Sequence, residues 1–270
     1  MKSRPKFDKR PLIRAGIILF VVSTFIGAIC MSAVGIDRLF FSANPHFIVR
    51  EIQILRTKGN LNDEDIKARL ELNIDEQDYN IFALDLGELR EKLIVDPIIE
   101  EAEVLRKLPD TLEVIVSGRT PVAQLLTRNG KTVDAKGYLM PYGRTETLRN
   151  LPIIRGIKNV KNASFGTRLN DPMLAKALEF LRHKAMSSSG NMIEISSICC
   201  NPRYNELNII LKENRKHSIL RGARLDLPVN GMEHAFKRTI VALEARSYAR
   251  QPSGHIKAIY DRLAISPHLP

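Results

Sequence analysis

The sequence predicts an α+β protein with a single N-terminal transmembrane helix followed by two folded domains. Three patterns carry this prediction: an uncharged apolar run over residues 15–36, the order strand, helix, helix, strand, strand over residues 47–118, and a mixed, β-rich pattern with helices over residues 119–265. Two helices on one face of a three-stranded sheet bury both apolar stripes, so residues 47–118 form a compact α+β unit. Residues 37–46 are then a linker, and residues 266–270 are the C-terminal end.

Ala15 to Ile36 is predicted to be a transmembrane helix. A helix of these 22 residues is about 33 Å long, and the hydrocarbon core of a bilayer is about 30 Å thick. Residues 1–14 form a basic tail with six cations and one acid, which favours a cytoplasmic N-terminus. We therefore expect a single-pass protein of the cytoplasmic (inner) membrane, with the residues after Asp37 outside the cytoplasm.

Three other interpretations of this run are less favoured. The apolar core of a cleavable signal peptide is about 7–15 residues long, and this run is longer. A lipoprotein signal needs a small residue before its cysteine, but Cys30 follows Ile29. A buried helix of a soluble protein usually has a polar stripe, and this run offers only Ser23, Thr24 and Ser32.

Composition excludes several classes of function. The net charge is +11, of which the basic tail supplies +5 and the apolar run none, so +6 remains for the rest of the chain. That moderate excess has no dense Lys/Arg block, so we expect no nucleic-acid partner. Cys199 and Cys200 are adjacent and no C-x-x-C occurs, so neither a disulfide framework nor a redox motif is predicted.

The elements of the first domain follow from capping signals and apolar periodicity. Asn62 precedes three acids, which is typical of a helix N-terminus, and Pro109-Asp110 forms the turn of a hairpin. Beside that turn, Arg106 and Lys107 are expected to be solvated. The predicted elements are strand 47–55, a helix from Asn62, helix 85–95, and strands 99–105 and 111–117.

The second domain begins at Arg119 and has shorter strands. Pro172 at the first position of a helix and Glu233 three residues after Asn230 mark two helix starts. The predicted strands are 122–127, 131–134, 138–141, 151–154, 192–198, 206–212, 217–220 and a last strand over 256–265.

Several motifs occur in a fixed order along residues 47–156. Gly118 to Ala123 is similar to an E-R-x-P-x-A element with Gly118 in the acidic position, and Val133 to Gly137 matches V-D-x-x-G. The remaining motifs are Phe47 to Ile52, Pro97 to Leu112, and Leu151 to Gly156, which is similar to L-P-x-x-x-G. Together they resemble the FtsQ/DivIB family of bacterial cell division proteins, whose first extracytoplasmic domain is a POTRA (polypeptide-transport-associated) domain.

The resemblance implies a partner-binding site in the last strand region of the second domain. In the family this region binds FtsB (DivIC) and FtsL by adding a strand at an open sheet edge. Tyr260 occupies the family's tyrosine position, whereas Lys257 and Ile259 replace the expected Asp and Arg. The residues expected to contact the partner are Ile256, Ala258, Ile259, Tyr260 and Arg262.

The implied function is that of a non-enzymatic membrane-anchored scaffold at the division septum, which links divisome proteins through its extracytoplasmic domains. The alternative is a membrane-anchored envelope enzyme that acts on cell-wall polymer. The chain has no H-E-x-x-H, G-x-S-x-G, P-loop or G-x-G-x-x-G motif. We therefore predict no catalytic, cofactor-binding or metal-binding residues, no cofactor and no small-molecule substrate.

We predict that residues 45–270, produced without the apolar run, fold as a soluble monomer, because both cores lie beyond residue 45. Size-exclusion chromatography with light scattering measures this directly. A stable dimer, or aggregation that detergent relieves, would contradict the expectation.

Overall fold

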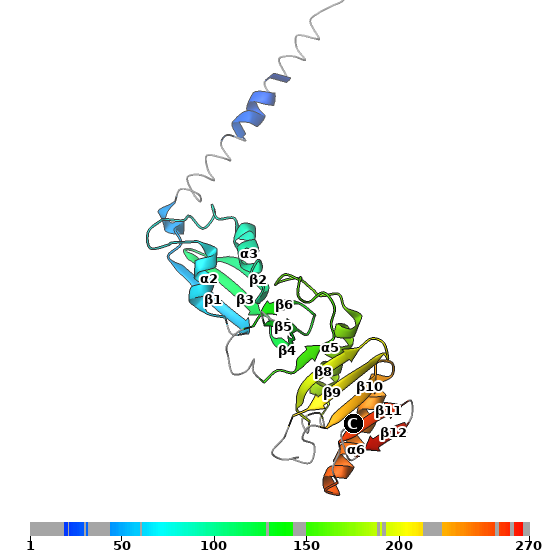
Figure 1. Cartoon of the computed structure of the whole chain (residues 1–270). Helices are drawn as coiled ribbons and strands as arrows, with labels where there is room; N and C mark the ends of the chain where they lie inside the picture. Colours follow the sequence, from blue (N-terminus) through cyan, green and yellow to red (C-terminus); the bar gives the residue numbers. More distant parts are fainter. Residues whose placement is uncertain are drawn as a thin grey trace, which may run out of the picture. The chain divides into compact units, whose positions relative to one another are not determined.

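The structure is a computed structural model of the chain (Figure 1). It describes residues 19, 20, 22–29, 31, 44–59, 61–127, 130–142, 150–187, 190, 193–212, 223–251, 254–259 and 262–266. By spatial proximity the chain divides into two compact units. The first comprises Met1–Leu55, Asn62–Lys92 and Ala102–Ile115, and the second comprises Arg56–Leu61, Leu93–Glu101 and Val116–Pro270.

Within the described residues, no helix has the length and apolar character needed to cross a bilayer. Half of the predicted transmembrane segment, Ala15 to Ile36, lies outside the described residues, although residues 22–29 are helical. The basic tail over residues 1–14 also lies outside them. The transmembrane helix therefore stays a prediction from the sequence.

A three-stranded sheet with two helices follows the short 3-10 helix η2 (Pro45–Phe47). The strands stand in the order β1-β3-β2, and the chain order is strand, helix, helix, strand, strand, as predicted. The elements are β1 (Glu51–Lys58), α2 (Asp63–Leu70), α3 (Leu86–Ile94), β2 (Ile99–Lys107) and β3 (Thr111–Gly118).

Local sequence explains these elements. The Asn62 side chain accepts a hydrogen bond from the Glu64 N–H at 3.4 Å and caps α2. The Asp85 carboxylate accepts from two N–H groups, at 2.8 and 3.1 Å, just before α3. Strand β3 alternates strictly, and its inward side chains Leu112, Val114 and Val116 have no exposed surface.

The structure adds a structural role to Arg106 beside the β2–β3 turn. Arg106 is exposed, as predicted, and its guanidinium also donates to the carbonyl oxygens of Ile81 (2.7 Å) and Leu84 (2.8 Å). It thereby ties the loop before α3 to β2. Lys107 does keep an exposed side chain, and its ammonium donates to Gln53 at 2.9 Å.

The second sheet has nine strands in the order β12-β11-β10-β9-β8-β7-β4-β5-β6. Strand β10 was not predicted, and the predicted strand 217–220 lies outside the described residues. The strands are β4 (Pro121–Leu125), β5 (Lys131–Asp134), β6 (Leu139–Pro141), β7 (Ile153–Arg155), β8 (Ile195–Asn201), β9 (Glu206–Leu211), β10 (Arg224–Pro228), β11 (His255–Ile259) and β12 (Arg262–Ser266).

Two strand–helix–strand crossovers place helices on this sheet. Helix α5 (Pro172–Met186) joins the parallel pair β7 and β8, and α6 (Met232–Tyr248) joins the parallel pair β10 and β11. The two helices contact each other and cover one face of the sheet (Figure 1). All other neighbouring strands are antiparallel except β4 and β7.

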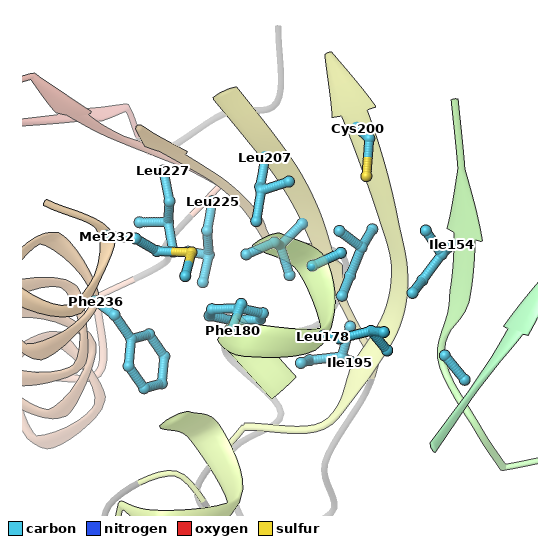
Figure 2. Close-up of a cluster of buried hydrophobic side chains, with 14 of the residues drawn as sticks. Ile154, Leu178, Phe180, Ile195, Cys200, Leu207, Leu225, Leu227, Met232 and Phe236 are labelled. Carbon is cyan, nitrogen blue, oxygen red and sulfur yellow. The ribbon is translucent and has the colours of Figure 1, made fainter. Parts of the chain in front are cut away.

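The core of this domain lies between the sheet and the two helices. The ring of Phe180 on α5 meets the ring of Phe236 on α6 edge to face, with 5.1 Å between centroids. Figure 2 shows Phe180 between Phe236 on one side and Leu178 and Ile195 on the other. Phe180 is fully buried, so helix–helix and helix–sheet packing share one apolar centre.

The adjacent cysteines of β8 lie on opposite faces of the sheet. Cys200 packs into the core and its thiol lies 3.7 Å from the carbonyl oxygen of Met173, whereas Cys199 is exposed. Burial raises the pKa of the Cys200 thiol to about 12. Alternation along the strand explains the difference.

A buried lysine holds the loop after β7 against the β5 strand. The Lys131 side chain is only 6% exposed, and its ammonium donates to the carbonyl oxygens of Val160 (2.8 Å), Lys161 (3.2 Å) and Ala163 (2.5 Å). Three acceptors match the three donors of an ammonium group. The loop over residues 160–163 is therefore fixed by one side chain.

We predict that Lys131→Met lowers the free energy of unfolding by about 1–3 kcal/mol, because it leaves buried carbonyl oxygens without their donor. Urea unfolding of the variant measures the change. Lys161→Met, at an exposed side chain of the same loop, is the matched control and should unfold like the native chain. Equal stability of the native chain and Lys131→Met would contradict this role.

Candidate partner-binding edge

The two edges of the nine-stranded sheet differ in whether the chain's own backbone covers them. At the β6 end, the segment 166–169 lies along the strand and pairs with it. The N–H of Leu139 donates to the carbonyl oxygen of Thr167 at 3.0 Å, and the N–H of Gly166 donates to the carbonyl oxygen of Leu139 at 2.8 Å. Tyr138 and Arg168 form an isolated antiparallel β-bridge. This end is thus covered by the chain's own backbone.

Strand β12 forms the other end of the sheet. It pairs with β11 on one side, and no strand of the described chain pairs with its outer side. Alternate backbone N–H and C=O groups of an edge strand point away from the sheet. The β12 edge therefore offers main-chain donors and acceptors to another strand.

The composition of β12 leaves this edge open to pairing. Natural edge strands are usually protected by lysines, prolines, bulges or inward-pointing charges. Beyond Arg262 the strand reads Leu263-Ala264-Ile265-Ser266, which contains no charge and no proline. Ile265 is 38% exposed, so the strand also presents apolar surface.

The structure places the predicted contact residues on both sides of a hairpin. Residues 256–265, expected as one strand, form the antiparallel pair β11 and β12, in which Ile259 lies opposite Arg262. Ile256 and Ala258 are buried in the core, whereas Ile259 (44% exposed) and Arg262 are at the surface. Tyr260 lies outside the described residues.

The hairpin register decides which residues of β12 face the helices. Ile256 lies opposite Ile265, and Ala258 lies opposite Leu263. Paired residues of antiparallel strands share a face, so Leu263 and Ile265 face the helix-covered side. Leu263 packs against the core, which fixes the side-chain alternation of β12.

A polar network supports the hairpin on the other face of the sheet. The buried carboxylate of Asp226 accepts hydrogen bonds from Asn208 (2.7 Å) and Arg224 (2.9 Å), and it lies 2.8 Å from His255 Nε2. These residues come from β9, β10 and β11, so one carboxylate links three strands next to the edge. Sequence reasoning missed this network, because its residues are far apart in the chain.

The network sets the ionisation of Asp226. Burial alone would raise the pKa of this carboxyl, but the hydrogen bonds from Arg224, Asn208 and His255, together with the Arg224 charge, hold its pKa below the ordinary value. The carboxylate is therefore the stable form in the folded protein.

Beside the hairpin end of β11 lies a hollow of about 750 Å³ that the sequence did not reveal. Its walls come from the β8–β9 turn, the start of α6 and β11. The lining includes Tyr204, which is 63% exposed, with His234, Lys257 and Ile259.

Two of the motifs noted in the sequence meet at the start of the second domain. Arg119 Nη1 lies 2.8 Å from Asp134 Oδ2, and the guanidinium lies over the Tyr138 ring at 4.0 Å. The other Asp134 oxygen accepts from the N–H groups of Lys136 (2.9 Å) and Tyr138 (2.8 Å). This nearly buried pair closes the β5–β6 hairpin and has a structural role.

The described residues contain no group of three or more His, Cys, Asp or Glu side chains arranged to hold a metal ion. The open strand edge, with its supporting Asp226 network, is the candidate site that the described residues offer.

We predict that Asp226→Asn lowers the free energy of unfolding by about 1–3 kcal/mol at pH 7, since it removes a charged hydrogen-bond acceptor. The folded-state pKa lies below the unfolded value of about 3.9, so the stabilisation is complete above that pH and is lost as the pH falls through the folded-state pKa. Urea unfolding of both proteins between pH 7 and pH 3 measures the difference. Glu103→Gln, at an exposed acid on β2, is the control; a pH-independent difference for Asp226→Asn would contradict the assignment.

Comparison with known proteins supports the assignment of the first domain. The family model "POTRA domain, FtsQ-type" matches residues 47–119, the region of the three-stranded sheet. The cell division protein DivIB of Clostridium acetobutylicum is 25% identical over 158 residues, which cover 57% of this chain and 60% of the relative. The cell division protein FtsQ of Novosphingobium aromaticivorans is 29% identical over 131 residues, covering 48% of this chain and 40% of the relative.

The cell division protein FtsQ of Koribacter versatilis is 38% identical over 93 residues, which cover 33% of this chain and 26% of the relative. The matched part of the chain thus spans less than two thirds of the length of each of these relatives. The resemblance seen in the sequence motifs is confirmed: residues 47–119 match the FtsQ-type POTRA domain, and the chain is similar to cell division proteins named FtsQ and DivIB.

Proposed function

We propose that this chain is a non-enzymatic scaffold of the bacterial division machinery. The run Ala15 to Ile36 would anchor it in the cytoplasmic membrane at the septum, and its extracytoplasmic POTRA and β domains would link other divisome proteins. The names of its relatives support a role in cell division. The single observation that carries the scaffold role is the difference between the covered β6 edge and the open β12 edge.

The proposed mechanism is strand addition at β12. A partner segment would extend the sheet by one strand, so main-chain hydrogen bonds supply affinity and alternating side chains supply specificity. Leu263 and Ile265 would meet apolar partner residues on the helix side, whereas Arg262 and Ala264 would meet residues on the other side. Because β11 is held by β10, the core and the Asp226 network, β12 rests on a rigid neighbour.

The partners proposed for this edge are FtsB (DivIC) and FtsL. A partner segment that becomes ordered on binding loses part of the interaction free energy to that ordering. Confinement of both chains to one membrane raises their effective concentration, so a modest contact suffices. A short edge strand of five residues fits such a contact.

The alternative, an envelope enzyme acting on cell-wall polymer, makes a different prediction. If the chain is a scaffold, its depletion blocks septation while cell mass still increases. If it is an enzyme, the purified protein cleaves wall polymer. Complementation of depleted cells by edge variants therefore separates the two functions.

We predict that one of two proline variants, Leu263→Pro or Ala264→Pro, weakens co-purification with FtsB and FtsL about tenfold or more while the domain stays folded in thermal melts. Neighbouring N–H groups of a strand point in opposite directions, so one of the two faces outward and proline removes it. Titration of the tagged full-length chain with the partners measures this.

Ala264→Thr keeps the N–H group and is the matched control, which should bind normally and restore septation. If both proline variants bind with full affinity, strand addition at β12 is wrong.

A further inference from the structure

We infer that a groove beside the C-terminal half of α5 is a second docking site, and that it takes an acidic amphipathic helix of a partner protein. The groove has a volume of about 770 Å³, within the range of known binding pockets. Its walls come from the start of β4, the segment 150–152, α5 and the start of β8. It is separate from the β12 edge, which lies beyond β9, β10 and β11 in the strand order.

The floor of the groove is apolar. It is formed by Leu178 and Leu181 of α5, Ile195 of β8, Leu151, and Val122 of β4. Leu178 and Ile195 belong to the buried core, whereas Leu181, Leu151 and Val122 are half-buried and face the hollow. An apolar floor of this kind favours a partner with an apolar stripe.

The rim of the groove is basic. Arg182, Lys184 and Lys212 surround the floor, against a single acid, Glu194. Lys212 is held in place, because its ammonium donates to the carbonyl oxygen of Asn150 at 3.0 Å and its backbone N–H donates to the backbone carbonyl oxygen of Glu194 at 2.7 Å. Within the described residues, neither Arg182 nor Lys184 forms an ion pair with a carboxylate.

The position of Lys184 in the last turn of α5 is also favourable to the helix dipole. That explanation does not extend to Lys212, which follows β9 and comes from a different part of the chain. Cations from two separate elements therefore converge on one apolar floor.

The apolar floor and the basic rim together favour a partner helix with an apolar stripe and acidic neighbours. Apolar residues at i, i+3, i+4 and i+7 of a helix form a stripe that fits an apolar groove, and acids beside the stripe would meet the basic rim. A basic helix would be repelled by the same rim. An anionic lipid or wall polymer shares the negative charge, so the test must distinguish these occupants from a helix.

The test uses the purified full-length chain and a fluorescein-labelled peptide of about 15 residues, with leucines at the stripe positions and glutamates elsewhere. We expect saturable binding by fluorescence anisotropy that weakens as salt is raised. A scrambled peptide of the same composition and a peptide with lysine in place of glutamate should bind at least about tenfold more weakly.

The double variant Arg182→Glu/Lys212→Glu should lose about tenfold in affinity for the acidic peptide. The matched control is Arg155→Glu/Arg203→Glu, which makes the same change of charge at exposed positions outside the groove and should bind normally. Ala264→Pro, which changes the β12 edge, should also bind the acidic peptide normally. The proposal for the groove and the proposal for the β12 edge can therefore fail independently.

No saturable binding up to about 1 mM, or equal affinity for the scrambled peptide, would overturn the proposal. It would equally be overturned if phosphatidylglycerol vesicles bound through Arg182 and Lys212 while the peptide did not.

Discussion

A β-sheet that does not close into a barrel leaves backbone N–H and C=O groups at two edges, and these groups need partners or water. The nine-stranded sheet of this chain meets the constraint in two ways. At β6 the segment 166–169 supplies the partners from within the chain, and Lys131 holds the loop that leads there. At β12 the described chain supplies no such partner, so the edge is left for another molecule.

The rest of the domain makes that open edge usable. Two crossovers put α5 and α6 on one face, where Phe180 and Phe236 pack together, and β11 is thereby fixed between β10 and β12. On the other face, Asp226 connects β9, β10 and β11 through charged hydrogen bonds. A flexible edge would lose more entropy on pairing than one that is held on both faces, so this rigidity favours association.

Local signals allowed much of the first domain to be predicted from the sequence. Asn62, the acids after it and the alternation of β3 act within a few residues, and each was found where the sequence placed it. The hydrogen bonds of the exposed Arg106 were not predicted, because its acceptors, the carbonyls of Ile81 and Leu84, are set by tertiary structure. For the same reason, the division of residues 256–265 into β11 and β12 and the Asp226 network could not be read from spacing.

The two neighbouring thiols of β8 have a practical consequence. Cys199 is open to solvent on the sheet face opposite the helices, whereas Cys200 is enclosed and resists deprotonation. Alkylating reagents attack thiolates, so within this domain a maleimide dye or spin label would attach to Cys199 alone. The native sequence thus carries a built-in attachment point from which distances to a bound ligand can be monitored without engineering a new cysteine.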